Sequence, residues 1–209
     1  MTKADILLQM HDFCDTLNEN QRRLVADAVT LRTYKRGQAI YSAGDKPLNL
    51  LCLLDGKVKI VKQGVGDRQQ IVRVLRPVSY FGYRASFAGE RFATAAVAFE
   101  ACVVGFIQLN LVHTLMAQSH RLAMFFMRQL SIYLGQADAR TVSLTQKHIR
   151  GRLAETLLFL RDSYGLEDDG CTLSIALSRE DIACLSNMTT SNAIRTLSAF
   201  AHEGVIATV

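Results

Sequence analysis

The sequence lacks the features of a secreted, disulfide-bonded or membrane-spanning protein. Its first residues, MTKADILLQMHD, show no charged and then apolar segment, so no secretory signal peptide is expected. The longest apolar run, residues 94–112, is interrupted by Glu100, Gln108 and Asn110, so no transmembrane helix is expected. The cysteines form no C-x-x-C pair, which favours reduced thiols in a cytoplasmic protein; they are Cys14, Cys52, Cys102, Cys171 and Cys184.

Signatures of catalysis are also absent. The five histidines are His11, His113, His120, His148 and His202, and none lies within residues 31–107, which are rich in predicted strands. A metal-dependent enzyme of the cupin type needs histidines converging from such strands, so this class is excluded. No nucleophile elbow, P-loop or dinucleotide fingerprint occurs. We therefore expect neither enzyme activity nor a bound metal or other cofactor.

Two short helices around a tight turn are predicted over residues 178–206. Ser178 and Asp181 have the spacing of a capping box, and Asn187 suits the left-handed backbone of a turn. Thr189 or Thr190 is expected to cap the second helix. Its apolar positions recur at helical spacing and are expected to face a core: Ala193, Ile194, Leu197 and Phe200.

The opposite face of this second helix carries short polar groups and one guanidinium, from Thr190, Ser191, Asn192 and Arg195. A helix that is apolar inside and hydrogen-bonding outside has the properties needed to read the DNA major groove. The residues alone also fit an ordinary helical hairpin whose polar face meets solvent.

Residues 31–107 read as short strands separated by glycines, after a helical segment at 4–29. Residues 50–54 form a continuous apolar strand, and Asp55-Gly56 predicts a hairpin to the next strand. A further turn is predicted at 64–67. Several strands at this spacing predict an antiparallel β-roll or jelly roll.

The chain resembles the CRP/FNR family of regulators, named after the cyclic-AMP receptor protein and the fumarate-nitrate regulator. The resemblance rests on SREDIA at 178–183, TS at 190–191, RTL at 195–197 and EGVI at 203–206. It extends to KRGQ at 35–38, AGD at 43–45 and GKVK at 56–59, which are similar to the family's cyclic-nucleotide-binding roll. It implies an α+β fold: a sensor domain at 1–108, a dimerisation helix at 109–144 and a winged helix-turn-helix at 145–209, whose wing would be incomplete at Val209.

Residues 109–144 are predicted to form one long helix. Within it a strict 4-3 spacing predicts a coiled-coil seam between two copies of the chain, formed by Ala123, Met127, Leu130, Leu134, Ala137, Thr141 and Leu144. The alternative is a single helix whose stripe packs on its own roll. Leu122, Phe125 and Phe126 are expected to pack on the roll.

The family's nucleotide cassette is altered at the positions that bind cyclic AMP. By the resemblance, Tyr83 replaces a ribose-binding Glu, Arg84 replaces a Leu, and Phe92-Ala93 stand where Arg-Ser would hold the phosphate. Binding of cyclic AMP in the usual way is therefore not expected, and the cysteines do not match the family's iron–sulfur cluster. A small anionic effector remains a candidate, held by Gly82, Tyr83, Arg84, Ser86, Arg91, Thr94 and Asp138. The alternative is that Arg84 and Arg91 are solvated or paired with Glu90 or Asp138.

The resemblance also assigns roles in DNA binding. Thr190, Ser191 and Arg195 align with base-contacting positions, and Arg195 keeps the family's residue type, which reaches guanine. Phosphate-positioning places are matched by Ser178, Arg179, Thr189 and Asn192. The implied partners are double-stranded DNA and a second copy of the chain, with RNA polymerase a further candidate, in the cytoplasm of a bacterium.

The distribution of charge favours a different partner for the C-terminal region. The whole chain carries a net charge of +5, yet residues 145–209 hold six Lys and Arg against eight Asp and Glu, a net charge of −2. DNA-binding domains usually show a basic surface. The alternative function is therefore a ligand-sensing signalling module whose helical C-terminal domain binds protein.

Overall fold

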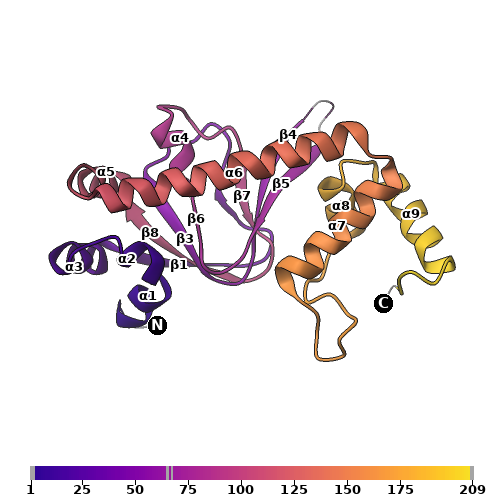
Figure 1. The fold of residues 1–209 in the computed structure, drawn as a ribbon, viewed down its shortest axis with the longest axis horizontal. Coiled ribbons are helices and arrows are strands. Elements are labelled where there is room, and N and C mark those ends of the chain that lie inside the picture. The colour runs from indigo at the N-terminus through magenta and orange to yellow at the C-terminus, as the bar shows by residue number, and fades with distance from the viewer. Residues whose placement is uncertain (1–2, 65, 67, 208–209) are drawn as a thin grey trace. The chain divides into compact units, whose positions relative to one another are not determined.

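The computed structural model describes residues 3–64, 66 and 68–207. The chain divides into two compact units: Met1–Lys62 with Arg73–Gly135, and Gln63–Val72 with Gln136–Val209. Figure 1 shows both units, with most of their helices and strands labelled. The first holds the N-terminal helices and most of the β-strands, and the second holds the C-terminal helices. Each unit is described by itself below.

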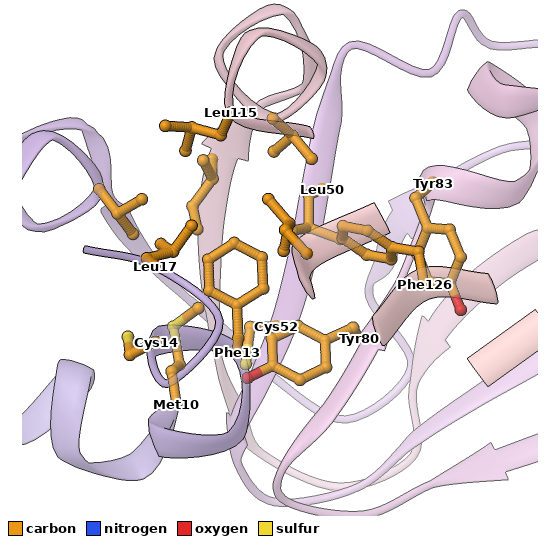
Figure 2. Packing of buried hydrophobic residues seen from close by; sticks show 14 of the residues in the cluster. Met10, Phe13, Cys14, Leu17, Leu50, Cys52, Tyr80, Tyr83, Leu115 and Phe126 are labelled. Atoms are coloured by element: carbon orange, nitrogen blue, oxygen red, sulfur yellow. The ribbon is translucent and has the colours of Figure 1, made fainter. Parts of the chain in front are cut away.

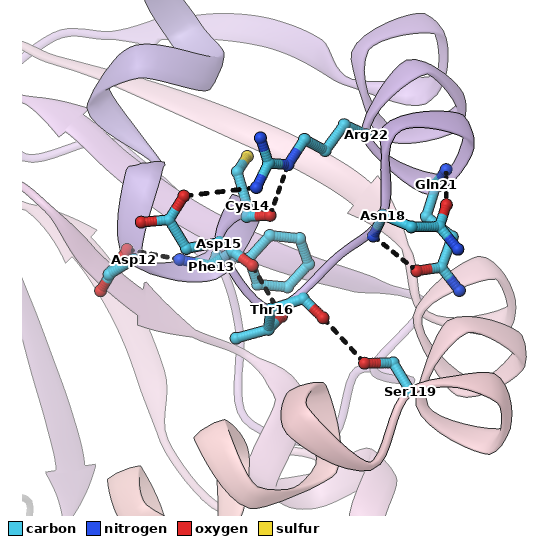
Figure 3. A network of polar contacts seen from close by, with 9 residues as sticks. All are labelled: Asp12, Phe13, Cys14, Asp15, Thr16, Asn18, Gln21, Arg22 and Ser119. Atoms are coloured by element: carbon cyan, nitrogen blue, oxygen red, sulfur yellow. Dashed lines mark hydrogen bonds and ion pairs between the residues drawn. The ribbon is translucent and has the colours of Figure 1, made fainter.

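The predicted N-terminal helical segment consists of three helices: α1 (Lys3–Gln9), α2 (His11–Cys14) and α3 (Glu19–Ala28). Asn18 is the N-cap of α3 and forms a capping box with Gln21. Its side chain accepts from the Gln21 backbone N–H, and the Gln21 side chain accepts from the Asn18 N–H. Arg22 of α3 donates to the Cys14 carbonyl at 2.8 Å, which ties α3 back to the end of α2 (Figure 3).

Two four-stranded antiparallel sheets form the roll, as expected. The first has the order β1 (Thr30–Tyr34), β8 (Cys102–Gln108), β3 (Asn49–Asp55), β6 (Ser79–Phe81); the second has the order β2 (Ala39–Tyr41), β7 (Ala95–Ala98), β4 (Val58–Gln63), β5 (Gln69–Leu75). A short helix, α4 (Tyr83–Phe87), follows β6. The rings of Tyr41 on β2 and Phe81 on β6 lie 6.4 Å apart, so the two sheets pack on each other.

The predicted hairpin at Asp55-Gly56 is wrong in its pairing. The turn is there, with Gly56 at a φ of 77°, but β3 and β4 belong to different sheets. A side chain at this glycine would place its Cβ 2.2 Å from the Ala101 carbonyl oxygen, which explains why glycine occupies the crossing. In the turn predicted at 64–67, Val65 and Asp67 lie outside the described residues.

The core of the first unit lies between one face of β3 and the surrounding helices (Figure 2). Alternate residues of β3, Leu50, Cys52 and Leu54, face this cluster because successive side chains of a strand point to opposite sides. Phe13 of α2 stacks on Tyr80 at 5.6 Å and meets Phe126 edge to face at 6.2 Å. The helices thus bury the outer face of this sheet.

The long helix predicted at 109–144 is interrupted. It consists of α5 (Leu109–Gln118) and α6 (His120–Gln146), with Ser119 in an extended conformation between them. The Ser119 hydroxyl donates to the Thr16 carbonyl at 2.8 Å (Figure 3). It also accepts from the Leu122 N–H at 3.2 Å. The break therefore arises because Ser119 begins α6 and is held by a distant loop.

The second unit is built on three helices: α7 (Ile149–Tyr164), α8 (Arg179–Leu185) and α9 (Thr190–His202). Its core is formed by Leu153, Ile182, Leu197 and Phe200. Residues 171–177 alternate apolar and polar positions, as a strand would, but form no strand: among the described residues of this stretch, only Leu173 forms a bridge, with Leu166. Asp169 accepts from the N–H groups of Cys171 and Thr172, which removes two donors that a strand would need.

No strand of the predicted wing lies among the described residues. Residues 204–207, the described residues that follow α9 and its C-cap, form no strand, and Thr208 and Val209 lie outside the described residues.

Candidate nucleic-acid interface and effector region

The capping box predicted at the start of α8 is confirmed. The Asp181 N–H donates to the Ser178 hydroxyl at 3.0 Å, and the Ser178 N–H and hydroxyl donate to an Asp181 carboxylate oxygen. Arg179, the first residue of α8, is exposed. The capping box places Ser178 and Arg179 at the N-terminal end of α8.

The turn between α8 and α9 has the predicted left-handed residue, since Asn187 has a φ of 49°. The turn is tied to α7 by a buried polar contact, in which the Ser186 hydroxyl donates to the Thr156 hydroxyl at 3.0 Å. Thr156 donates in turn to the Arg152 carbonyl. Because both hydroxyls are buried and satisfied, they hold the turn in one position against α7.

Of the two candidate caps for α9, the structure selects Thr189, whose hydroxyl accepts from the Asn192 N–H at 3.3 Å. Thr190, Ser191 and Arg195 are exposed, and Asn192 is half-buried. In residues 3–64, 66 and 68–207, no acceptor or carboxylate pairs with the Arg195 guanidinium. Helix α9 therefore presents short hydroxyls and one unpaired cation on its first two turns.

Three of the four apolar positions expected to face the core do so: Ala193, Leu197 and Phe200 are buried. Ile194 is the exception, with 47% of its surface exposed. It lies at the side of α9 and lines an open hollow of about 270 Å³ together with Arg179, Leu197, Ser198 and Ala201. The helical period predicted a wider apolar stripe than the three-helix core covers.

In the cassette, Gly82 and Tyr83 serve the fold. Gly82 has a φ of 85°, and a Cβ there would lie 2.2 Å from the Leu51 side chain. Tyr83 is 2% exposed and its ring packs on Phe87 and Phe126, so in this structure it belongs to the core. Its hydroxyl meets no partner among the described residues, and burial raises its pKa.

Two predicted effector residues, Arg84 and Thr94, influence the pKa of Tyr41. Burial raises the pKa of Tyr41, while a hydrogen bond with Thr94 and the positive charges of Arg73 and Arg84 oppose this shift. Tyr41 stacks on Phe92 with the ring centroids 3.8 Å apart. Tyr41 and Arg73 come from β2 and β5 and carry no motif of their own, so nothing in the sequence pointed to them.

The remaining members of the predicted effector set have other surroundings. The Ser86 hydroxyl lies 3.2 Å from the ring nitrogen Nε2 of His113. Arg91 donates to the Gly44 carbonyl at 2.8 Å, so its guanidinium holds a turn and is not paired with Glu90. Asp138 is exposed on α6 and belongs to the second unit. Arg84 and Thr94 are thus the members of the predicted set that influence the pKa of Tyr41.

The predicted seam of α6 is largely uncovered in the single chain. Met127 and Leu134 are 57% and 64% exposed, and Ala137 and Thr141 are exposed as well. Ala123 and Leu144 are half-buried, and Leu130 packs partly on the first unit's core. Leu122, Phe125 and Phe126 pack on that core, as expected.

No described helix has the length and apolar character needed to span a lipid bilayer. Nor do the described His, Cys, Asp and Glu side chains gather in any group of three or more that could hold a metal ion.

The sequence matches two domain families. Residues 31–119 match the cyclic nucleotide-binding domain, and residues 151–209 match the Crp-like helix-turn-helix domain. The CRP-like cAMP-activated global transcriptional regulator of Mycobacterium tuberculosis is 25% identical over 175 residues, which cover 83% of this chain and 78% of that protein. The transcriptional regulator LdrP of Thermus thermophilus is 28% identical over 178 residues, covering 85% and 88%.

Among solved structures, FixK2 from Bradyrhizobium japonicum has the same fold. Its TM-score is 0.75 at 22% identity, with 86% of this chain and 88% of that chain covered. The architecture and these matches define a transcription regulator with a cyclic-nucleotide-binding-type domain and a DNA-binding helix-turn-helix domain. The chain belongs to the CRP/FNR family. Membership in this family favours DNA, and not a protein, as the partner of the C-terminal domain.

Proposed function

We propose that the chain works as a homodimer that reads a two-fold symmetric DNA site through α9. The observation that carries the proposal is the exposed Arg195, with the exposed Thr190 and Ser191, on a helix whose start is held by the Thr189 cap; no described residue pairs with the Arg195 guanidinium. A guanidinium can donate two hydrogen bonds to guanine O6 and N7, whereas hydroxyls contact several bases. Ser178, Arg179, Thr189 and Asn192 would contact phosphates and set the register.

The exposed seam of α6 supports the homodimer. Met127, Leu134, Ala137 and Thr141 are uncovered, and a second copy of the same helix would bury them in a parallel coiled coil. Two-fold symmetry would then place two copies of α9 on half-sites about one helical turn of DNA apart. Such a regulator acts where the DNA is, in the cytoplasm, and RNA polymerase is a further candidate partner.

A small anionic effector at the roll is proposed as the controlling ligand. Its support is electrostatic: burial raises the pKa of Tyr41, and a hydrogen bond with Thr94 and the positive charges of Arg73 and Arg84 oppose that shift. The M. tuberculosis relative is cAMP-activated by its name. In this chain Tyr83 is in the core and Phe92 stacks on Tyr41, so neither supplies the ribose or phosphate contact of the usual cassette. Control by cyclic AMP in the usual way is therefore not proposed.

Selection of bound duplexes from a random DNA pool tests the reading function. We expect enrichment of a palindrome with half-sites about one helical turn apart. Enrichment of one unpaired half-site would contradict the dimer, and no enrichment would contradict DNA reading. A charge-matched control, Arg161→Ala on α7, should select the same sequence as the unaltered protein.

Calorimetric titration tests the effector region, with cyclic AMP and inorganic pyrophosphate as separate probes. We expect no saturable binding of cyclic AMP and weak binding of pyrophosphate that Arg84→Ala abolishes. Arg91→Ala is the control, because Arg91 is occupied by the Gly44 carbonyl. Saturable binding of cyclic AMP that survives Arg84→Ala would overturn the proposal.

A further inference from the structure

Side chains from outside the helix-turn-helix donate hydrogen bonds to carbonyls at the C-terminal end of α8. An α-helix leaves its last four carbonyls without partners inside the helix. In α8 the carbonyls of Ile182 and Ala183 accept from the turn, from the N–H groups of Ser186 and Met188. The last two carbonyls receive donors from elsewhere in the chain: the Gln70 side-chain amide donates to Cys184, and Arg140 donates to Leu185 at 3.0 Å.

Arg140 joins three segments that are distant in sequence. Besides the Leu185 carbonyl, its guanidinium donates to the carbonyls of Ile71 at 2.7 Å and Val72 at 3.1 Å, both on β5. A planar guanidinium offers five donors in a fixed geometry, so one side chain can serve a strand and a helix end together. A lysine ammonium lacks this planar geometry.

The electrostatics of this contact favour a cation. The C-terminal end of a helix carries a partial negative charge from its free carbonyls, and a guanidinium there is stabilising. Burial lowers the pKa of the Arg140 guanidinium, which nevertheless stays charged at neutral pH. Within residues 3–64, 66 and 68–207, Arg140 has carbonyl partners and no carboxylate partner. Arg140 thus acts through hydrogen bonds to backbone carbonyls.

The same strand continues toward the candidate effector region. Val72, whose carbonyl accepts from Arg140, is followed by Arg73, whose guanidinium lies 4.5 Å from the centre of the Tyr133 ring. Arg73 is also one of the two cations that act on Tyr41.

We propose that Arg140 and Gln70 are positioning residues for DNA recognition. They hold the end of α8, and hence the turn that sets α9, in register with strand β5. The proposal rests on DNA reading by α9. It adds that the reading helix depends on donors from β5 and α6 that touch no DNA.

Two kinds of measurement on the full chain test it. The first is amide hydrogen exchange at Ser186 and Met188, whose N–H groups bond to α8, in the free protein. The second is affinity for the selected operator and for single-base variants of it. Arg140→Gln should speed exchange at both amides and weaken binding to all these duplexes about tenfold, with the base preference unchanged. Arg140→Lys, which keeps the charge without the planar geometry, should restore only part of the affinity.

Arg128→Gln is the matched control, because Arg128 is an exposed arginine of the same helix. It should change neither exchange nor affinity. If Arg140→Gln does not fold, Gln70→Ala carries the test: it should speed exchange at Ser186 and Met188 and weaken binding by a smaller factor in the same direction. The double variant should lose less affinity than the product of the two fold losses of the single variants, since both side chains act on one helix end.

Unchanged exchange would overturn the link to α8. Faster exchange with unchanged affinity would show that Arg140 and Gln70 only stabilise the fold, and would overturn the positioning role. A changed base preference would place Arg140 in direct readout and contradict the proposal as well. If the unaltered chain binds no duplex, DNA reading fails, and exchange in the free protein separately decides whether Arg140 holds α8.

Discussion

Arg195 is the residue on which sequence recognition should depend most directly. It is exposed on the second turn of α9, and its charge is not neutralised by any described carboxylate. An arginine that donates two hydrogen bonds to a guanine contributes both affinity and base preference.

Arg195→Ala should therefore cost about 1–3 kcal/mol of binding free energy and relax specificity at one base pair of each half-site. Fluorescence anisotropy with the operator and its single-base variants measures both effects. Arg161→Ala removes the same charge from α7 and should preserve the base preference. An equal loss for Arg195→Ala across all duplexes would assign Arg195 to phosphate contact instead.

The buried thiol of Cys14 should make the free energy of unfolding depend on pH in the alkaline range. It is 5% exposed, and burial raises the pKa of its thiol from 9.0 to about 11, with Asp15 and Asp12 adding to the shift and Arg22 opposing it. The unfolded chain ionises first, so the free energy of unfolding should fall as pH rises from 9.0 to about 11.

Urea unfolding at several pH values checks this slope. Cys14→Ala should make the slope shallower, and Cys171→Ala, at an exposed thiol, should leave it unchanged. A slope that Cys14→Ala does not alter would show that Cys14 ionises alike in both states.

At the scale of elements, neighbouring residues of α6 have opposite roles. Phe126 is 1% exposed and its ring meets those of Phe13, Tyr83, Phe87 and Phe125. Met127, the next residue, is 57% exposed. The first half of α6 is thus held to the roll by one side, and the other side is open.

Phe126→Ala should lower the free energy of unfolding by about 3–5 kcal/mol, because it removes a large buried side chain and leaves a cavity. In dilute, monomeric protein Met127→Ala should change it by less than about 0.5 kcal/mol. Urea unfolding at low protein concentration measures both. Equal losses for the two variants would mean that the two side chains are buried alike.

Elements with local signals were predictable, and elements with distant partners were not. The capping box of α8 and the turn at Asn187 depend on residues within a few positions of each other, and both are confirmed. Asp55-Gly56 looked like a hairpin, but the choice of sheet for β4 is made by its pairing with β7. The break in α5 and α6 at Ser119 involves Thr16, about a hundred positions away.

At the scale of the whole molecule, the proposed dimer depends on the exposed seam of α6. Leu134 is 64% exposed and lies in the middle of that seam. Leu134→Glu would place two carboxylates at the centre of a parallel coiled coil, where they repel and lose hydration.

Sedimentation velocity should therefore show a monomer for Leu134→Glu at concentrations where the unaltered chain is a dimer. Binding to the palindrome should weaken more than binding to a single half-site, because only the palindrome uses both copies. Leu8→Glu is the control, since Leu8 is 76% exposed on α1 and lies outside the seam. Dimeric Leu134→Glu protein would locate the interface elsewhere.

The amino-acid sequence alone was enough to predict the antiparallel roll, the capped α8, the turn and the polar face of α9, because spacing and capping act between near neighbours. Tertiary structure decided the rest. Tyr83 is in the core because α6 brings Phe126 against it, and Ile194 is exposed because three helices cover only part of α9. Arg73 and Arg84 influence the pKa of Tyr41, and Arg140 reaches the carbonyls of β5 and α8, through interactions between residues far apart in sequence. Such contacts carry no local pattern, since they depend on which strands and helices pack together.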